Sequence, residues 1–301
     1  MKHFLEKARQ ILKDTKNNFR GDEPVVHSAA IAFFTIFSLP AILIVLTFIG
    51  SVFFREAAVR KELIKEVEDM ISVKAGNQAS TVLENMLDTP AGFWGILIGI
   101  IVVLQSASVI FFMMQKGLNA IWKVRVKPGV NFFRLLLHRL IPLVMIIGLG
   151  LLLAISLLLD TIIAMYSEDL QNVFEAYFTP AVRTVNTIFY LSVVLIFFTA
   201  VHKVLPDVRV GWKDALAGGV ITSVLFLIGK QIINFVLSNV QLIGVYAAAG
   251  SLVVLLLWVF YSSIILLLGA EVTKSYAKNH GREIIPKAIA IKYKKISGEE
   301  K

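Results

Sequence analysis

Residues 214–271 read DALAGGVITSVLFLIGKQIINFVLSNVQLIGVYAAAGSLVVLLLWVFYSSIILLLGAE, and this stretch decides the fold of the chain. It holds two long apolar runs joined by a short uncharged link. Each run exceeds the roughly 20 residues that a helix needs to cross the hydrocarbon layer of a bilayer. The stretch therefore predicts two consecutive transmembrane helices.

A lysine, Lys230, lies inside the first of these runs. A charged side chain at that depth costs about 2.5–3.5 kcal/mol on insertion scales unless it finds partners or water. On a helix Lys230 shares one face with Gly219, Thr222, Ser223 and Asn234, so this face is expected to look into protein or into a polar cavity. The alternative is that the ammonium snorkels outward along its four-carbon stem and has only a structural role.

The composition of the whole chain also indicates a membrane protein. Of its 301 residues 57% are hydrophobic and 17% are charged, and the mean hydropathy is +0.76. A soluble domain carries charge on about a quarter of its residues. The net charge of +9 is therefore interpreted as cytoplasmic loops that contact anionic lipid headgroups, and not as a nucleic-acid surface. The absence of cysteine excludes disulfides and thiolate metal sites.

Outside the central stretch, four further apolar segments predict an all-α, polytopic membrane protein with six transmembrane helices. An amphipathic basic helix precedes them, and two short amphipathic helices are expected in an outer loop. The predicted organisation is an N-terminal interfacial helix (1–27), a membrane domain (28–273) and a basic cytoplasmic tail (274–301). The four other spans are expected at 28–53, 92–114, 138–163 and 183–202, and the outer loop at 55–89.

The orientation follows from the distribution of Lys and Arg. The N-terminal segment, the 115–139 loop, the 203–213 loop and the C-terminal tail together carry 23 of the 30 basic residues, and the opposite side carries six. The positive-inside rule then places both termini of this multi-pass membrane protein in the cytoplasm. In the basic 115–139 loop, Trp122 is expected to anchor the chain at the membrane interface.

Polar residues on other predicted spans extend the candidate cavity. Gln105 lies in the second span and Asn186 in the fourth. Asp160 lies at the outer end of the third span, where the predicted topology makes it a feasible partner for Lys230. The candidate substrate-binding set is therefore Lys230, Asn234, Ser223, Gly219, Gln105, Asn186 and Asp160.

Glu271, which closes the last apolar run, is expected to have different partners. The predicted topology places it at the inner face, too far from Lys230 for direct contact. We expect Glu271 to meet cytoplasmic bases such as Arg139 or Lys203, or to face water.

The chain lacks the residue patterns of a catalytic or metal site. A metal-dependent nuclease needs several His and carboxylate ligands that converge on one site. The sequence contains no His-x-His, no His-Glu-x-x-His, no phosphate-binding loop and no glycine-rich dinucleotide turn. We therefore expect a protein that is not an enzyme and takes no metal or cofactor. The five histidines stand isolated at positions 3, 27, 138, 202 and 280.

Three blocks of sequence resemble one family of bacterial inner-membrane proteins. The blocks are SAAIAFFTIFSLPAIL (28–43), LNAIWKV (118–124) and the pair GGVITSVLFLIGKQIINFVLSN (218–239) with GVYAAAGSLVVLLLWVFYSSIILLLGAE (244–271). In this order they resemble the BrkB/YihY family, and the resemblance spans nearly the whole chain. It implies the same six-span plan, with family positions at Ser38, Pro40, Asn119, Trp122, Tyr246, Gly250, Trp258 and Glu271.

The resemblance implies little about activity, because the family has no established common substrate. Members are linked to virulence, serum resistance and handling of envelope lipids. Some are labelled ribonuclease BN, a label that the missing catalytic motifs disfavour here. The sequence favours a transporter or flippase for a lipid, a lipid-linked precursor or a small anionic solute. The alternatives are a non-catalytic envelope scaffold that acts through its basic cytoplasmic surface and, disfavoured by the same absence of motifs, a membrane-embedded enzyme.

Overall fold

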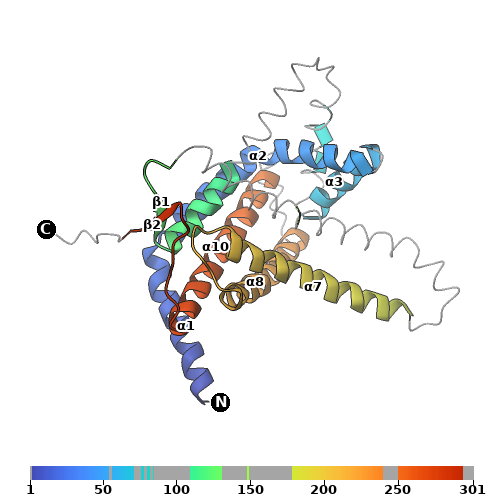
Figure 1. Cartoon of the computed structure of the whole chain (residues 1–301). Helices are drawn as coiled ribbons and strands as arrows, with labels where there is room; N and C mark the ends of the chain where they lie inside the picture. The colour runs from blue at the N-terminus through green and yellow to red at the C-terminus, as the bar shows by residue number, and fades with distance from the viewer. Residues whose placement is uncertain are drawn as a thin grey trace. The chain divides into compact units, whose positions relative to one another are not determined.

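The computed structural model shows a mainly helical chain (Figure 1). It describes residues 2–53, 56–70, 76–77, 80–81, 84, 109–130, 148, 178–239 and 250–293. The labelled helices are α1 (Lys2–Gly21), α2 (Pro24–Phe53), α3 (Glu56–Met70), α7 (Phe178–Val204), α8 (Trp212–Asn239) and α10 (Gly250–Asn279), and a further helix runs over Val109–Ile121.

Three of the described helices are long and apolar enough to cross a membrane. Their apolar windows are Thr187–Val204 in α7, Trp212–Ile233 in α8 and Leu255–Asn279 in α10. They correspond to the predicted fourth, fifth and sixth spans. The 30-residue helix α2 occupies the predicted first span. The predicted third span and most of the second lie outside the described residues.

The amphipathic helices and the ends of the spans match the predictions in part. The predicted N-terminal helix is confirmed as α1, and the first helix predicted in the 55–89 segment is confirmed as α3, while the side of the membrane on which it lies stays a prediction. Two helices run further than expected. The helix expected to end at Met114 continues to Ile121, and α10 continues eight residues beyond Glu271, to Asn279.

The C-terminal end of α10 has a local cause. Gly281 adopts a left-handed backbone conformation (φ 67°), and the N–H of Arg282 donates to the carbonyl oxygen of Ala277 at 3.0 Å. This is the Schellman arrangement, which satisfies the last free carbonyl groups of a helix and favours glycine at the left-handed position. Glu271 therefore lies within a helix and not at its end.

The chain divides into two compact units. Unit 1 comprises Met1–Asp22, Leu118–Leu225 and Leu268–Lys301, and unit 2 comprises Glu23–Gly117 and Phe226–Leu267. The boundary crosses α8 and α10, which contribute residues to both units. The predicted division into terminal helix, membrane domain and tail stays a prediction.

Unit 1 contains a small sheet that the all-α prediction missed. Strands β1 (Val124–Val126) and β2 (Ala290–Lys292) pair antiparallel, with Arg125 opposite Ile291. A hydrophobic cluster next to the sheet contains Trp122, Val124, Val208, Val210 and Ala215, with Ile284 packed against it. The predicted role of Trp122 as an interfacial anchor is wrong, because its side chain is only 3% exposed. Apolar burial in this core outweighs the interfacial preference of the indole ring.

Unit 2 is held by aromatic and small-residue packing. Trp258 on α10 lies against Phe226 of α8 and against Tyr261, with ring centroids 5.4 and 6.1 Å apart. A Cβ atom at Gly229 would overlap the ring of Tyr261. The missing side chain of Gly229 therefore allows α8 and α10 to approach closely at this level.

Candidate functional site: a polar seam and an ionic cluster

Small and polar side chains gather where α7, α8 and α10 meet in unit 1. A Cβ atom at Gly218 would overlap the carbonyl oxygen of Gly269. A Cβ atom at Gly269 would overlap Thr222 Oγ1 and lie 2.7 Å from His202 Nε2. Glycine at both positions lets α8 and α10 approach backbone to backbone, as small residues do in membrane helices. We call this region the polar seam; its residues are Thr199, His202, Gly218, Gly219, Thr222, Ser223 and Gly269.

The imidazole ring of His202 lies buried in the seam, and 1% of the surface of this residue is exposed. Its Nε2 atom lies 2.9 Å from Thr222 Oγ1, and the Thr222 hydroxyl donates to the carbonyl oxygen of Gly218, also at 2.9 Å. A hydroxyl has one hydrogen to donate, so Thr222 must accept its bond from the ring. In the neutral imidazole the proton therefore lies on Nε2, and Nδ1 is a hydrogen-bond acceptor.

Three buried atoms of the seam retain unused hydrogen-bonding capacity. Thr199 Oγ1, His202 Nδ1 and Ser223 Oγ have no hydrogen-bond partner within the described parts of the chain. Burying such a group unpaired costs about 1–3 kcal/mol. The described parts of the chain therefore leave one imidazole acceptor and two hydroxyl groups of the seam unused.

A second buried site in unit 1 contains four charged groups. Asp22, which follows α1, forms ion pairs with Lys123 and Lys274, the latter at 3.6 Å. Lys274 Nζ also lies 3.1 Å from Glu271 Oε2. We call Asp22, Lys123, Glu271 and Lys274 the ionic cluster. The carboxylates are almost fully buried, so their charges depend on these two lysines.

The expectation for Glu271 holds in part: its side chain meets a basic residue, but that residue is Lys274 and not Lys203. The side chain does not face water, because Glu271 is 0% exposed. Its cation is Lys274, one helical turn further along α10. Lys203 instead donates to the backbone carbonyl of Val210, and Arg139 lies outside the described residues. Lys274 was not named as the partner because the prediction ended the helix at Glu271 and assigned Lys274 to the tail.

Asn119 and Asp207 form a buried reciprocal pair in unit 1. Asn119 Nδ2 donates to Asp207 Oδ2 at 2.7 Å, and the Asp207 backbone N–H donates to Asn119 Oδ1 at 2.8 Å. The pair joins the helix that ends at Ile121 to the loop after α7. Asn119 was singled out only through the family resemblance, and the structure gives it this structural role.

Two basic side chains of the segment after α10 also bind groups of unit 1. Lys287 Nζ donates to the carbonyl oxygen of Val204, at the end of α7, at 2.8 Å. Burial lowers the pKa of the Lys287 ammonium; Asp207 acts in the opposite direction, and Lys203 lowers the pKa further. Arg282 binds the buried carboxylate of Asp214 at the start of α8, and this hydrogen bond raises the pKa of the guanidinium.

The stripe predicted around Lys230 is divided between the two units. Gly219 packs against Thr199, and Ser223 is buried with them in unit 1. Lys230 is half-buried in the unit 2 part of α8. The other predicted site residues that the structure describes lie on four helices: Ser38 and Pro40 on α2, Asn186 on α7, Asn234 on α8, and Gly250 and Trp258 on α10. Three more, Gln105, Asp160 and Tyr246, lie outside the described residues.

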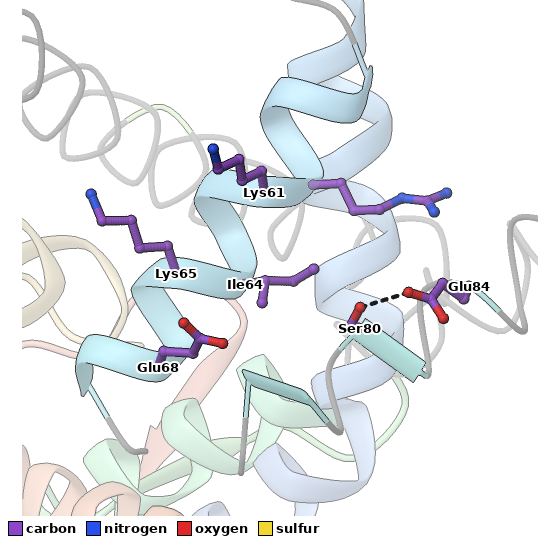
Figure 2. A pocket seen from close by; sticks show the side chains of 7 residues that line it. Lys61, Ile64, Lys65, Glu68, Ser80 and Glu84 are labelled. Atoms are coloured by element: carbon purple, nitrogen blue, oxygen red, sulfur yellow. Dashed lines mark hydrogen bonds between the residues drawn. The ribbon is translucent and has the colours of Figure 1, made fainter. Parts of the chain in front are cut away.

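Unit 2 also contains an open groove of about 810 Å³, shown in Figure 2. Lys61 and Lys65 extend from one side of α3, and on the other side Ser80 Oγ donates to Glu84 Oε1 at 2.7 Å. The lining mixes both signs of charge and does not converge on one point, which makes the groove a weaker candidate than the seam. Its residues are Arg60, Lys61, Ile64, Lys65, Glu68, Ser80 and Glu84.

Among the described residues, no three His, Cys, Asp or Glu side chains converge on a point that could hold a metal ion. The comparison with known families is decisive for the class of protein. The model of the family described as virulence factor BrkB matches residues 15–289. The chain belongs to the BrkB family.

Curated relatives of this BrkB family member are named UPF0761 membrane proteins. One from Pseudomonas aeruginosa (strain LESB58) is 27% identical over 199 residues, which cover 64% of this chain and 46% of the relative. One from Legionella pneumophila is 28% identical over 61% of this chain and 42% of its own length. One from Yersinia pseudotuberculosis (serotype O:1b) is 25% identical over 63% of each. The chain thus spans less than two thirds of the length of these relatives, and no solved structure matches it.

Several residues of this BrkB family chain that the structure brings together were not predicted. Asp22, Asp207 and Lys274 lie close to the ends of helices, where a charged residue is ordinarily solvated. One signal was available for Asp207, which follows Leu-Pro and precedes Val-Arg-Val in a short loop. An acidic residue between apolar residues in so short a connection indicates a buried partner. The sequence does not show which residue that partner is, because Asn119 lies 88 residues away from Asp207 along the chain.

Proposed function

We propose that this BrkB family member is a transport protein of the bacterial inner membrane that moves a lipid, a lipid-linked precursor or a small anionic solute. The observation that carries the proposal is the polar seam, where Thr199 Oγ1, His202 Nδ1 and Ser223 Oγ are buried without a described partner. Polar groups inside membrane helices are costly, and those that persist commonly mark a pathway for a substrate or an ion. The proposal includes six crossings with both termini in the cytoplasm and assigns no catalytic step.

In this proposal the seam binds the polar part of the substrate while the apolar faces of the helices stay in lipid. Hydroxyl groups and an imidazole acceptor suit a headgroup with both donors and acceptors, such as a phosphate ester that carries hydroxyls. Separately from the seam, Lys230 in unit 2 is proposed to attract an anionic substrate by its positive charge. The two roles are separable because they fall on different residues.

The first experiment compares cells that lack the protein with cells that carry it or a variant. The variants are Lys230→Met, Ser223→Ala and, as a control, Ile232→Met, because Ile232 is 56% exposed on the same helix. Lipid and envelope composition is measured by mass spectrometry, and each variant is quantified in the membrane. We expect Lys230→Met and Ser223→Ala to reproduce the composition of the deletion, and Ile232→Met to match wild type. If cells with either test variant at normal abundance have the lipid and envelope composition of wild type, the transport proposal is contradicted.

A scaffold function is the second candidate, and the folded end of unit 1 favours it. The segment that follows α10 is held by the β1–β2 pairing, and the sheet and the turn after β1 expose Arg125, Lys127 and Lys292. Exchanging these three bases for Gln leaves the seam intact. If that variant loses function while Lys230→Met and Ser223→Ala keep it, the scaffold function replaces transport.

A further inference from the structure

One face of α8 in unit 1 is apolar and exposed along its length. Leu216, Val220 and Val224 recur every four residues, with 46%, 41% and 49% of their surfaces exposed. Residues at this spacing lie on one side of a helix, opposite the buried Gly218 and Thr222. Such a stripe on a membrane-spanning helix is the surface that lipid acyl chains cover.

The same face ends at Trp212, one turn before Leu216, with 63% of its surface exposed. The ammonium of Lys203 lies 5.3 Å from the centroid of the Trp212 ring. Trp side chains prefer the headgroup level of a bilayer, where one edge of the ring is in lipid and the other meets polar groups. Trp212 therefore marks the membrane boundary on this face of α8.

The ammonium of Lys203 is held in place by one hydrogen bond and has further N–H groups that can donate to a ligand. One of its N–H groups donates to the carbonyl oxygen of Val210, and an ammonium has three donors. The loop that carries Val210 is itself held, because the Arg209 N–H donates to the carbonyl oxygen of Ile285 at 2.9 Å. Lys213, next to Trp212, is exposed.

The nearby carboxylate does not cancel this positive charge. Asp214 is 1% exposed and is bound by Arg282. Lys203 and Lys213 therefore supply positive charge beside Trp212, while the apolar stripe continues directly from the ring. A partner that fits must be anionic at one end and apolar along the other.

We propose that this face of α8 binds an anionic phospholipid. Its phosphate is held by Lys203 and Lys213, its glycerol region packs on Trp212, and its acyl chains follow Leu216, Val220 and Val224. The site is on the outer surface of the helix, away from the seam, and is independent of the proposed transport function.

The test measures quenching of Trp212 fluorescence by brominated lipids in reconstituted vesicles. The signal of Trp212 is the difference between wild type and Trp212→Phe, because the chain has four tryptophans. Brominated phosphatidylglycerol is compared with brominated phosphatidylcholine at equal mole fractions. We expect a preference for phosphatidylglycerol that falls about fivefold for each lysine removed, in Lys213→Met and in Lys203→Met/Lys213→Met.

The control is Lys127→Met/Lys292→Met, which removes two exposed lysines at the sheet and should keep the preference. Lys213 is exposed, so Lys213→Met alone is expected to fold normally even if the double variant does not. Equal quenching of wild type by the two lipids would overturn the proposal. So would a preference that Lys213→Met keeps in full, or one that the control loses to the same degree.

Discussion

The ionic cluster and the polar seam both bury polar groups in unit 1, but they stabilise them in different ways. The cluster balances two carboxylates, Asp22 and Glu271, with two ammonium groups, Lys123 and Lys274. The seam contains no carboxylate or ammonium group and relies on glycines that let helix backbones approach. The cluster should therefore be sensitive to the loss of a charge, and the seam to the gain of a single methyl group.

The largest effect is expected for Lys274→Met. The change leaves Glu271 and Asp22, which are 0% and 5% exposed, without their shared cation. Breaking a buried ion pair by removing one partner costs about 3–5 kcal/mol. The free energy of unfolding in detergent micelles should fall by this amount.

The matched control is Lys278→Met, which removes an exposed lysine one turn further along α10 and should change stability by about 0.5 kcal/mol or less. The double variant Lys274→Met/Glu271→Gln should recover part of the loss, because it also removes the stranded charge. Equal stability of Lys274→Met and Lys278→Met would contradict the pairing in the cluster.

A smaller loss is expected when a methyl group is added to the seam by Gly218→Ala. The new Cβ would overlap the backbone carbonyl of Gly269, which cannot move without displacing α10. Overpacking of this kind costs about 1–3 kcal/mol, and the unfolding midpoint should report it. Gly21→Ala adds the same methyl group at the end of α1, where no atom lies within 4 Å of the new Cβ. An equal loss in both variants would show that close packing of α8 on α10 is not the cause.

The smallest effect is expected for a third kind of buried polar group, the single ammonium of Lys287, which belongs neither to the ionic cluster nor to the polar seam. Burial holds its pKa below the ordinary lysine value of 10.5, so at alkaline pH the unfolded chain binds this proton more tightly than the folded chain. The contribution of Lys287 to the free energy of unfolding is therefore lowest at neutral pH and rises as pH increases toward 10.5. Unfolding midpoints of wild type and Lys287→Met should differ by an amount that changes over this pH range. Parallel curves would show that the ammonium is not desolvated.

The class of fold follows from the sequence because hydrophobic run length is a local property. The apolar runs of residues 178–204, 212–239 and 250–279 each supply enough consecutive apolar residues for a span, whatever surrounds them. Composition and run length therefore predict the membrane helices without any knowledge of their neighbours. The ends of the helices are less predictable, because the end of α10 depends on the left-handed turn at Gly281 and not on where the apolar residues cease.

The candidate site was predicted only in outline. The shared face of Gly219, Thr222 and Ser223 follows from helical periodicity, and these residues are buried as that pattern indicates. The same pattern included Lys230, which belongs to a different compact unit. Periodicity identifies a helix face, but it contains no information on which neighbour covers each turn of that face.

For this protein, the sequence alone determined the membrane class, the apolar helices and the family, because each depends on local composition or on an ordered pattern along the chain. The tertiary structure decided the partners: Asn119 with Asp207, His202 with Thr222, Asp22 with Lys123, and Trp122 in a core instead of at an interface. The physical reason is that a buried polar group is stabilised by an atom within about 3 Å. That atom is supplied by a segment that only the folded chain brings near.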